Sequence, residues 1–250
     1  MVRLESIGDV AVLSLDRPAR HNALVPELLG ELLEARDSAA VRGAAALVLR
    51  AEGRSFSTGG DLLGFLEHRA SLADYAARLV GLLNQAILAI CRLETPSVCA
   101  VQGLVSGGSL GLLLACDRIV MQRDVTVRPW YGTVGFSPDG GWTALLPDLI
   151  GSRLTAQWLA SDIERDAASC LEIGLAHELG AQDPTAAAMA WARDVVALSR
   201  DGQRVTGALR KADAGVVAKG LEAERSAFVR QVQTTEALQG IERFLGRKPQ

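Results

Sequence analysis

The stretch of residues 98–117 constrains the fold most, because it joins an apolar strand to an apolar helix through glycines. Residues 98–101 are typical of a buried strand, and the apolar segment after Gly107 and Gly108 predicts a buried helix. The first N–H groups of a helix lack partners within the helix and carry the positive end of its dipole. A negative group would therefore be stabilised beside Gly108. The turn lacks the spacing of nucleotide-binding glycine loops, which disfavours a nucleotide phosphate site.

A second small-residue turn lies upstream, before Asp61. Residues 44–50 are typical of a buried strand, and Ser-Phe-Ser-Thr-Gly-Gly-Asp follows at 55–61. Two such turns could direct two backbone N–H donors at one point, which is what an oxyanion hole requires. From each turn alone, a role in packing only remains an alternative.

Composition excludes several functional classes. The chain has 250 residues, of which 49% are hydrophobic and 22% charged, enough for one large domain or a domain with an appendage. A net charge of −3 and scattered basic residues argue against nucleic-acid binding. No apolar run has the length of a membrane span, and the polar start is unlike a signal peptide, so we expect a cytoplasmic protein. The four cysteines and three histidines show no ligand spacing, and we expect no metal site.

Strand and helix patterns alternate through the first half of the chain. Strands are expected at 2–7 and 10–15, joined as a hairpin at Gly8, and at 98–101, 118–121 and 125–127. Helices are expected at 25–40 and 73–93, and such crossovers between strands imply parallel pairing. Pro147 is expected to interrupt a helix that runs through Leu146. Later come short helices at 152–160 and 165–172 and helices at 186–200, 207–221 and 222–245.

Five motifs follow one another along the chain. They are Arg-Pro-Ala-Arg-His-Asn-Ala-Leu at 17–24, Phe-Ser-Thr-Gly-Gly-Asp at 56–61, Ala-Val-Gln-Gly-Leu-Val-Ser-Gly-Gly at 100–108, Ala-Cys-Asp at 115–117 and Gly-Phe-Ser-Pro-Asp-Gly-Gly at 135–141. In order and spacing they resemble the signature blocks of the crotonase superfamily, the enoyl-CoA hydratase/isomerase family. The resemblance implies an α/β fold, the crotonase (ClpP-like) spiral of repeated β-β-α units, over residues 1–195. A link from helix to late strand at 174–181 is implied only by this resemblance. It also implies a C-terminal helical region, 196–250, that packs on neighbouring subunits of a homo-trimer or hexamer.

The resemblance further implies a chemistry. The substrate would be an acyl-CoA or acyl-carrier thioester, with coenzyme A as part of the substrate and no separate cofactor. Its enolate would be held by the N–H groups of Gly60 and Gly108. The positions of the two hydratase glutamates fall on Gly111 and Tyr131, which argues against ordinary hydration. Asp139 occupies the position where related isomerases carry the single acid that moves a double bond from the β,γ to the α,β position.

Substrate contacts are likewise implied by the resemblance. Arg20 is a candidate for the CoA phosphates, with Arg17 as a second, although both suit a solvated loop equally well. The other expected contacts flank the oxyanion hole or wall the acyl pocket, and they are Phe56, Thr58, Trp130, Tyr131, Phe136 and Trp142.

Alternatives remain open for the acid and for the reaction. Pro-Asp-Gly-Gly is a common turn sequence, so Asp139 could be only a turn residue or a helix cap. The family also changes its chemistry through a few pocket residues. Thioester hydrolysis, decarboxylation, dehydration or hydration, and a biosynthetic step on a carrier-bound chain are therefore rivals. A non-catalytic acyl-CoA-binding subunit is a further one.

Overall fold

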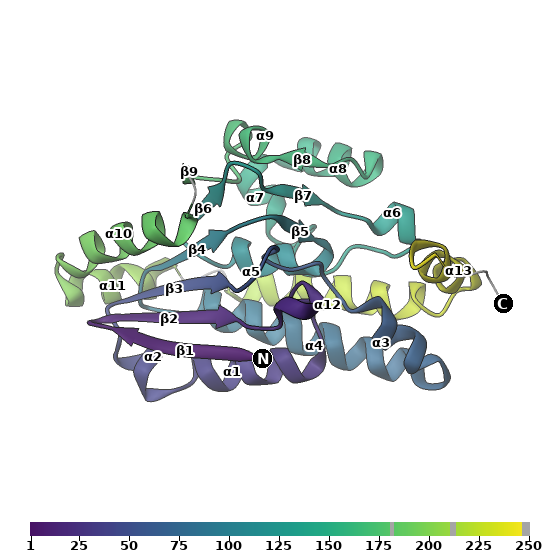
Figure 1. Cartoon of the computed structure of the whole chain (residues 1–250), viewed down its shortest axis with the longest axis horizontal. Coiled ribbons are helices and arrows are strands. Elements are labelled where there is room, and N and C mark those ends of the chain that lie inside the picture. The colour runs from purple at the N-terminus through teal and green to yellow at the C-terminus, as the bar shows by residue number, and fades with distance from the viewer. Residues whose placement is uncertain (181–182, 211–213, 247–250) are drawn as a thin grey trace.

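Two sheets form the framework of the computed structural model, which describes residues 1–180, 183–210 and 214–246 (Figure 1). Within these residues the large sheet has the order β1-β2-β3-β4-β6-β9 and the small sheet the order β5-β7-β8. The large sheet contains β1 (Val2–Ile7), β2 (Val10–Leu15), β3 (Ala46–Ala51), β4 (Ser97–Val101), β6 (Arg118–Gln122) and β9 (Glu178–Gly180). The predicted hairpin at Gly8 is confirmed, and the pairs from β2 to β9 are parallel, as the crossovers predicted.

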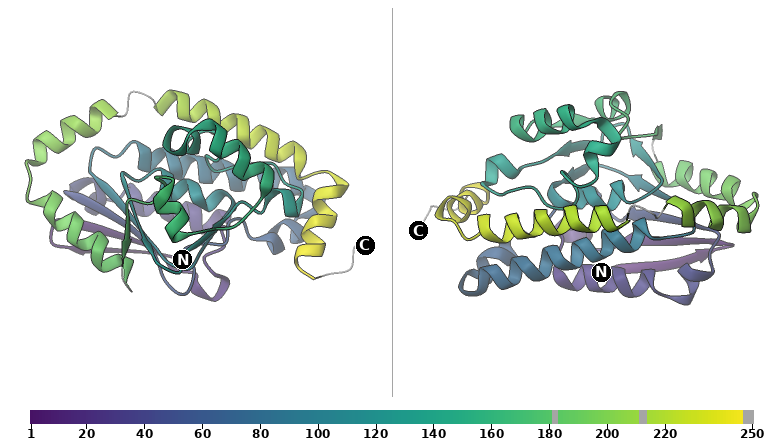
Figure 2. Two further views of the ribbon diagram at one scale, coloured as in Figure 1. Left: turned by 90° about the horizontal axis from the view of Figure 1, so that it is seen from above. Right: turned by 180° about the vertical axis from the view of Figure 1, so that it is seen from behind.

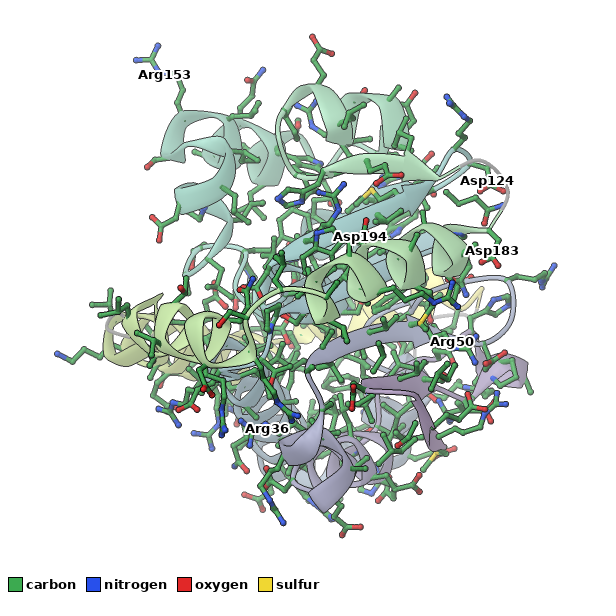
Figure 3. The ribbon with its side chains drawn as sticks, turned by 90° about the vertical axis from the view of Figure 1, so that its left-hand side faces the viewer. Arg36, Arg50, Asp124, Arg153, Asp183 and Asp194 are labelled. Carbon is green, nitrogen blue, oxygen red and sulfur yellow. The ribbon has the colours of Figure 1, made fainter. Side chains whose placement is uncertain are left out.

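The central strands are buried on both faces. Along β2, alternate residues point to opposite sides, so Val12 joins the core under α10 (Pro184–Val196) while Leu13 joins the larger core on the other side. Figure 3 views the molecule from the side of α10, where Asp183 caps the start of the helix and exposed Asp194 lies near its end. The opposite core includes α1 (Pro26–Arg36) and α4 (Leu72–Cys91), which lie beneath the sheet in Figure 1.

The small sheet carries the chain toward the second glycine turn. It contains β5 (Leu104–Ser106), β7 (Thr126–Arg128) and β8 (Arg165–Asp166). After β5 the chain forms the short 3-10 helix η3 (Gly107–Ser109) and then α5 (Leu110–Leu114). The predicted strand, turn and helix are therefore confirmed, with a shorter helix. α5 ends at Leu114, and Asp117 beyond it is tied to β4, where its carboxylate accepts hydrogen bonds from the N–H and hydroxyl of Ser97 at 2.8 and 3.0 Å.

Several predicted helix boundaries were wrong. The first helix breaks into α1 and α2 (Ala39–Gly43), and residues 165–166 form β8 before α9 (Ala167–Glu172) begins. Pro147 lies in the first turn of α7 (Leu146–Ile150), where a missing N–H costs nothing, and it does not interrupt a helix. The other short elements are η1 (Pro18–Arg20), α3 (Leu62–Glu67), η2 (Arg69–Ser71), α6 (Tyr131–Val134) and α8 (Ser152–Ser161). The predicted late strand is β9, and Ala181 lies outside the described residues.

The C-terminal helices also differ from the prediction. They are α11 (Arg200–Arg210), α12 (Ala214–Gln231) and α13 (Thr235–Phe244), so no helix begins at Glu222. Gly220 does not interrupt α12, because a Cβ there would lie 2.7 Å from that of Ala144 and the glycine serves close packing. Thr234 caps α13 by accepting from the N–H of Ala237 at 3.2 Å. Helix α12 lies alongside α4 of the same chain (Figure 2). Packing of residues 196–250 on a neighbouring subunit stays a prediction.

Two points follow for the protein as a whole. The arrangement of strands and helices is the α/β fold that the sequence predicted. In the described residues, no helix has both the length and the apolar character needed to cross a membrane.

Candidate active site

The two glycine turns meet backbone to backbone. The N–H of Ser106 donates to the carbonyl of Ser57 at 3.1 Å, which joins the two segments. A Cβ on Gly59, whose φ is +75°, would lie 2.7 Å from the carbonyl oxygen of Ser106 and 3.5 Å from the Cα of Gly107. Only glycine allows both this backbone conformation and this contact. The predicted convergence of the two turns is therefore confirmed.

The predicted donors, Gly60 and Gly108, both line one cavity between these turns. The carbonyl of Gly59 and the N–H of Asp61 both bond to Leu24, at 2.7 and 3.0 Å. Because backbone groups alternate in direction along an extended segment, the N–H of Gly60 points away from Leu24. Gly108 lies in the first turn of η3, where a backbone N–H has no partner within the helix. This geometry suits two donors that share one acceptor.

The cavity has a volume of about 210 Å³ and is lined mainly by apolar side chains. Its aromatic lining residues are Phe65, Trp130, Tyr131, Phe136, Phe228 and Phe244. Three of the expected walls, Trp130, Tyr131 and Phe136, thus lie at the cavity, as does Thr58. Sequence reasoning missed Phe228 and Phe244, since they come from α12 and α13, and no local motif marks either one.

Two expected contact residues, Phe56 and Trp142, do not line this cavity. Both side chains are fully buried in the core. The positive φ angles of Gly140 and Gly141 turn the chain inward, and the Trp142 ring packs at 5.1 Å from that of Trp158. The Trp142 indole N–H donates to the carbonyl of Gly107 at 2.8 Å. Trp142 therefore contacts the second glycine turn from the core and does not reach the cavity.

The candidate phosphate-binding arginines are engaged by an acid. Asp61 receives hydrogen bonds from Arg17 and Arg20, each at 2.9 Å, and it also caps α3 through the N–H of Leu63 at 3.2 Å. Neither arginine lines the aromatic cavity. The Arg20 side chain is 44% exposed, so a role in binding phosphate stays a prediction.

Asp139 lies directly against the second glycine turn. Both of its carboxylate oxygens are 2.8 Å from the point where a Cβ on Gly108 would stand. The next residue, Gly140, has a φ of +66°, and a Cβ there would lie 2.5 Å from the Cα of Gly108. The close approach of two glycines thus places the carboxylate at the cavity. Asp139 as a whole is only 7% exposed to solvent.

Tyr131 holds the Asp139 side chain. Its hydroxyl donates to Oδ1 of Asp139 at 2.7 Å and lies 3.0 Å from the carbonyl oxygen of the same residue. Burial raises the pKa of Asp139 to about 7, against the opposing effect of the Tyr131 hydrogen bond and with a smaller raising effect from the charge of Glu224. Burial and the Asp139 charge raise the pKa of Tyr131 well above its ordinary value. The Tyr131 hydroxyl therefore keeps its proton near neutral pH and donates a hydrogen bond to the Asp139 carboxylate.

The site has no room for a hydratase pair of carboxylates. A Cβ on Gly111 would lie 2.1 Å from the carbonyl oxygen of Gly140, so no glutamate side chain fits at that position. Tyr131 occupies the other position and contacts Asp139. Among the described residues that line the cavity, Asp139 is the one carboxylate.

The fold and the paired glycine turns define the class of this chain, and comparison with known proteins identifies it. The family profile described as "Enoyl-CoA hydratase/isomerase" matches residues 5–250. This chain therefore belongs to the enoyl-CoA hydratase/isomerase family of the crotonase superfamily and is an enzyme of the acyl-CoA class.

Individual relatives carry different activities in their names. YhaR of Bacillus subtilis, named for the same family, is 29% identical over 96% of this chain and 94% of its own length. A 4-chlorobenzoyl coenzyme A dehalogenase of Arthrobacter sp. is 32% identical over 71% of this chain and 65% of its own length. The crystal structure of an enoyl-CoA hydratase from Bacillus halodurans superposes with a TM-score of 0.89 at 25% identity, covering 97% of this chain and 99% of that one. Family membership thus leaves the reaction open.

Proposed function

We propose that this enzyme moves a double bond of an acyl-CoA from the β,γ to the α,β position, with Asp139 as the proton shuttle. The observation that carries the proposal is the single buried carboxylate beside the paired glycine turns. Hydration needs a second acid or base, whereas migration of a double bond needs only one group that takes a proton and returns it.

The proposed reaction has two proton transfers. Oδ1 of Asp139 accepts the Tyr131 hydroxyl, which leaves Oδ2 to remove a proton from the α carbon. The electron pair of that C–H bond forms a dienolate, whose oxygen accepts hydrogen bonds from the N–H groups of Gly60 and Gly108. Oδ2 then returns the proton to the γ carbon, and the α,β double bond remains. A carboxyl with a pKa of about 7 is suited to both steps near neutral pH.

The surroundings of Asp139 support this assignment. Aromatic walls limit the access of water, so the proton that Asp139 takes is returned to the substrate and is not lost to solvent. No separate cofactor is part of the proposal, and coenzyme A or a carrier protein would deliver the acyl group. Arg20 remains the proposed phosphate contact, and a homo-trimer or hexamer remains the proposed assembly.

The test incubates the wild type and Asp139→Asn with a medium-chain β,γ-enoyl-CoA in heavy water. Mass spectrometry measures how much α,β-enoyl-CoA forms and how much deuterium it contains. We expect the wild type to form the α,β-enoyl-CoA, and the variant to be slower by about 10²- to 10⁴-fold, the usual loss for a general base. Asparagine can still accept the Tyr131 hydrogen bond, so the turn should be retained. Asp148→Asn is the matched control, because exposed Asp148 does not line the cavity. Equal activity of wild type and Asp139→Asn would refute the shuttle.

A second candidate is displacement of a leaving group from an aromatic acyl-CoA. The six aromatic walls and the relationship to a 4-chlorobenzoyl coenzyme A dehalogenase favour it. Ionised Asp139 would attack the ring carbon and expel the leaving group, and water would then have to hydrolyse the resulting ester. It ranks second because the described lining residues offer no separate base to activate that water. Release of chloride from 4-chlorobenzoyl-CoA, lost in Asp139→Asn, would favour it over isomerisation.

The remaining rivals give other outcomes in the same assays. Hydrolysis or decarboxylation would appear as free coenzyme A or carbon dioxide in place of the migrated alkene. A non-catalytic subunit would bind the thioester without turnover, and its binding would not change in Asp139→Asn.

A further inference from the structure

A buried carboxylate on α12 contacts the turn that carries Asp139. Glu224 is 5% exposed, and its two oxygens accept four hydrogen bonds from this turn. One oxygen accepts from the N–H of Gly141 at 2.7 Å. The other accepts from the N–H and the hydroxyl of Thr143, at 2.6 and 2.7 Å, and from the N–H of Ala144 at 3.1 Å. All four donors lie within five residues of Asp139.

These contacts need a carboxylate and not merely a polar side chain. Backbone N–H groups that lose both water and a partner are costly. The turn at 141–144 presents three backbone N–H groups within one short segment, of which the Gly141 bond is buried and the other two are partly buried. An ionised carboxylate offers two acceptor oxygens and no donor, so it satisfies all of them at once. A glutamine would turn an amide N–H₂ toward one group of donors.

The same helix also forms part of the cavity wall. Phe228 lies four residues after Glu224, so both side chains occupy one face of α12, and Phe228 lines the cavity. The helix is held on α4 by hydrogen bonds from Asn84 to the carbonyl of Leu221 and from Arg225 to the carbonyl of Ala77, at 2.9 and 3.0 Å. α12 therefore connects the wall, the catalytic turn and α4.

We propose that Glu224 is a positioning residue, which holds the turn at 140–144 so that the Asp139 carboxylate stays against Gly108. This inference rests on the proposed role of Asp139 in catalysis. Glu224 does not touch the cavity, so it acts through the turn and not on the substrate.

The charge of Glu224 provides a second, independent signal. It contributes to the raised pKa of Asp139, behind burial as the main cause. The other titratable group that acts on Asp139 is Tyr131 from α6, whose hydrogen bond lowers the pKa. Loss of the Glu224 charge should lower this pKa whether or not the turn moves, so the pKa reports that the two carboxylates are close and kcat reports how well Asp139 is placed.

The experiment compares wild type, Glu224→Gln, Glu224→Asp and the control Glu242→Gln. Glu242 is equally buried, at 4% exposed, but it pairs with Arg69 on a different part of the chain. The titration of Asp139 is followed by ¹³C NMR of carboxyl-labelled aspartate, and the Asp139→Asn spectrum identifies its signal. Activity on a β,γ-enoyl-CoA is measured across pH in parallel.

Glu224→Gln should lower the pKa of Asp139 and reduce kcat about tenfold or more, with a smaller change in KM, because misplacement of a catalytic group lowers turnover. Glu224→Asp keeps the charge but shortens the reach, so kcat should fall while the pKa remains raised. Glu242→Gln should change neither quantity. An unchanged kcat in both Glu224→Gln and Glu224→Asp would overturn the proposal, whatever the titration of Asp139 shows.

The NMR readout does not depend on the reaction. If the wild type shows no isomerisation, the ¹³C shift of the Asp139 carboxyl is compared between wild type and Glu224→Asp, which keeps the charge. A changed shift would leave the role of Glu224 in placing Asp139 standing although the proposed function fails, and an unchanged shift would overturn that role. If Glu224→Gln does not fold, Thr143→Val is used instead. It removes the hydrogen bond from the Thr143 hydroxyl to Glu224 and keeps the charge of Glu224. That variant should lower kcat and leave the pKa raised, and an unchanged kcat would then count against the proposal.

Discussion

Replacing Tyr131 by phenylalanine would remove one hydroxyl and keep the aromatic wall of the cavity. The lost group is the donor at 2.7 Å to Oδ1 of Asp139. This hydrogen bond favours the ionised carboxylate and opposes the effect of burial on its pKa. The variant should therefore hold its proton more tightly, with a pKa above that of the wild type.

The size of the effect follows from the strength of the bond. A hydrogen bond to a charged group contributes about 1.5–3 kcal/mol, and each 1.36 kcal/mol changes the ratio of ionised to protonated carboxyl about tenfold. With a pKa of about 7, roughly half of the wild-type Asp139 is ionised at pH 7. In Tyr131→Phe the ionised share should be about 7% to 0.6%, so kcat/KM at pH 7 should fall about 7- to 80-fold.

The assay is the pH dependence of kcat/KM for isomerisation between pH 5 and 9.5. The Tyr131→Phe variant should regain activity as the pH rises, because a higher pH restores the ionised base. Tyr75→Phe is the matched control, since Tyr75 is the chain's other tyrosine, stacks on His68 and does not line the cavity. An acidic limb of Tyr131→Phe that coincides with that of the wild type would refute this account. A loss that is equal at every pH would instead show that the hydroxyl acts only by placing the carboxyl.

Two further predictions concern stability. The pKa of Asp139 is raised from 3.8 to about 7 by folding, so the folded state binds the proton more tightly, and stability falls as the pH rises through this window. Asp139→Asn should therefore be more stable than the wild type at pH 8, by at most about 4 kcal/mol, and the gain should be smaller at pH 5. Urea unfolding at the two pH values measures the gain. An equal gain at both would contradict the prediction. Gly111→Ala should destabilise by about 1–3 kcal/mol, because its Cβ would lie 2.1 Å from the Gly140 carbonyl oxygen. Gly30→Ala in α1 is the control, because a Cβ there meets open space, and it should raise the free energy of unfolding by about 0.5–1 kcal/mol. Thermal unfolding of both variants checks the difference. Equal shifts in Tm would show that the structure around Gly111 yields to the added methyl group.

Much of the framework could be predicted from local patterns. The hairpin at Gly8 and the parallel strands carry their information in hydrophobic runs and turn residues. The two glycine turns and the position of Asp139 were found from motifs whose order along the chain matches that of a known family. Helix ends were less accurate, since capping and tertiary packing decide where a helix stops.

The side-chain environment of the site was decided by the tertiary structure. Sequence reasoning placed Trp142 at the acyl pocket, but the turn at Gly140 and Gly141 carries its ring into the core. It assigned Tyr131 no specific partner, and the fold makes it the donor to Asp139. Neither outcome is visible in a local pattern, because each depends on how one turn packs against another.

The sequence by itself determined the class of fold, the family and the candidate carboxylate, because these depend on spacing along the chain. The tertiary structure decided which groups surround that carboxylate. Glu224 and Phe228 come from α12, more than 80 residues after Asp139, and reach the site only because α12 packs on α4. The burial that raises the pKa of Asp139 exists only once these distant segments have come together, since exclusion of water by packing is what penalises the charge.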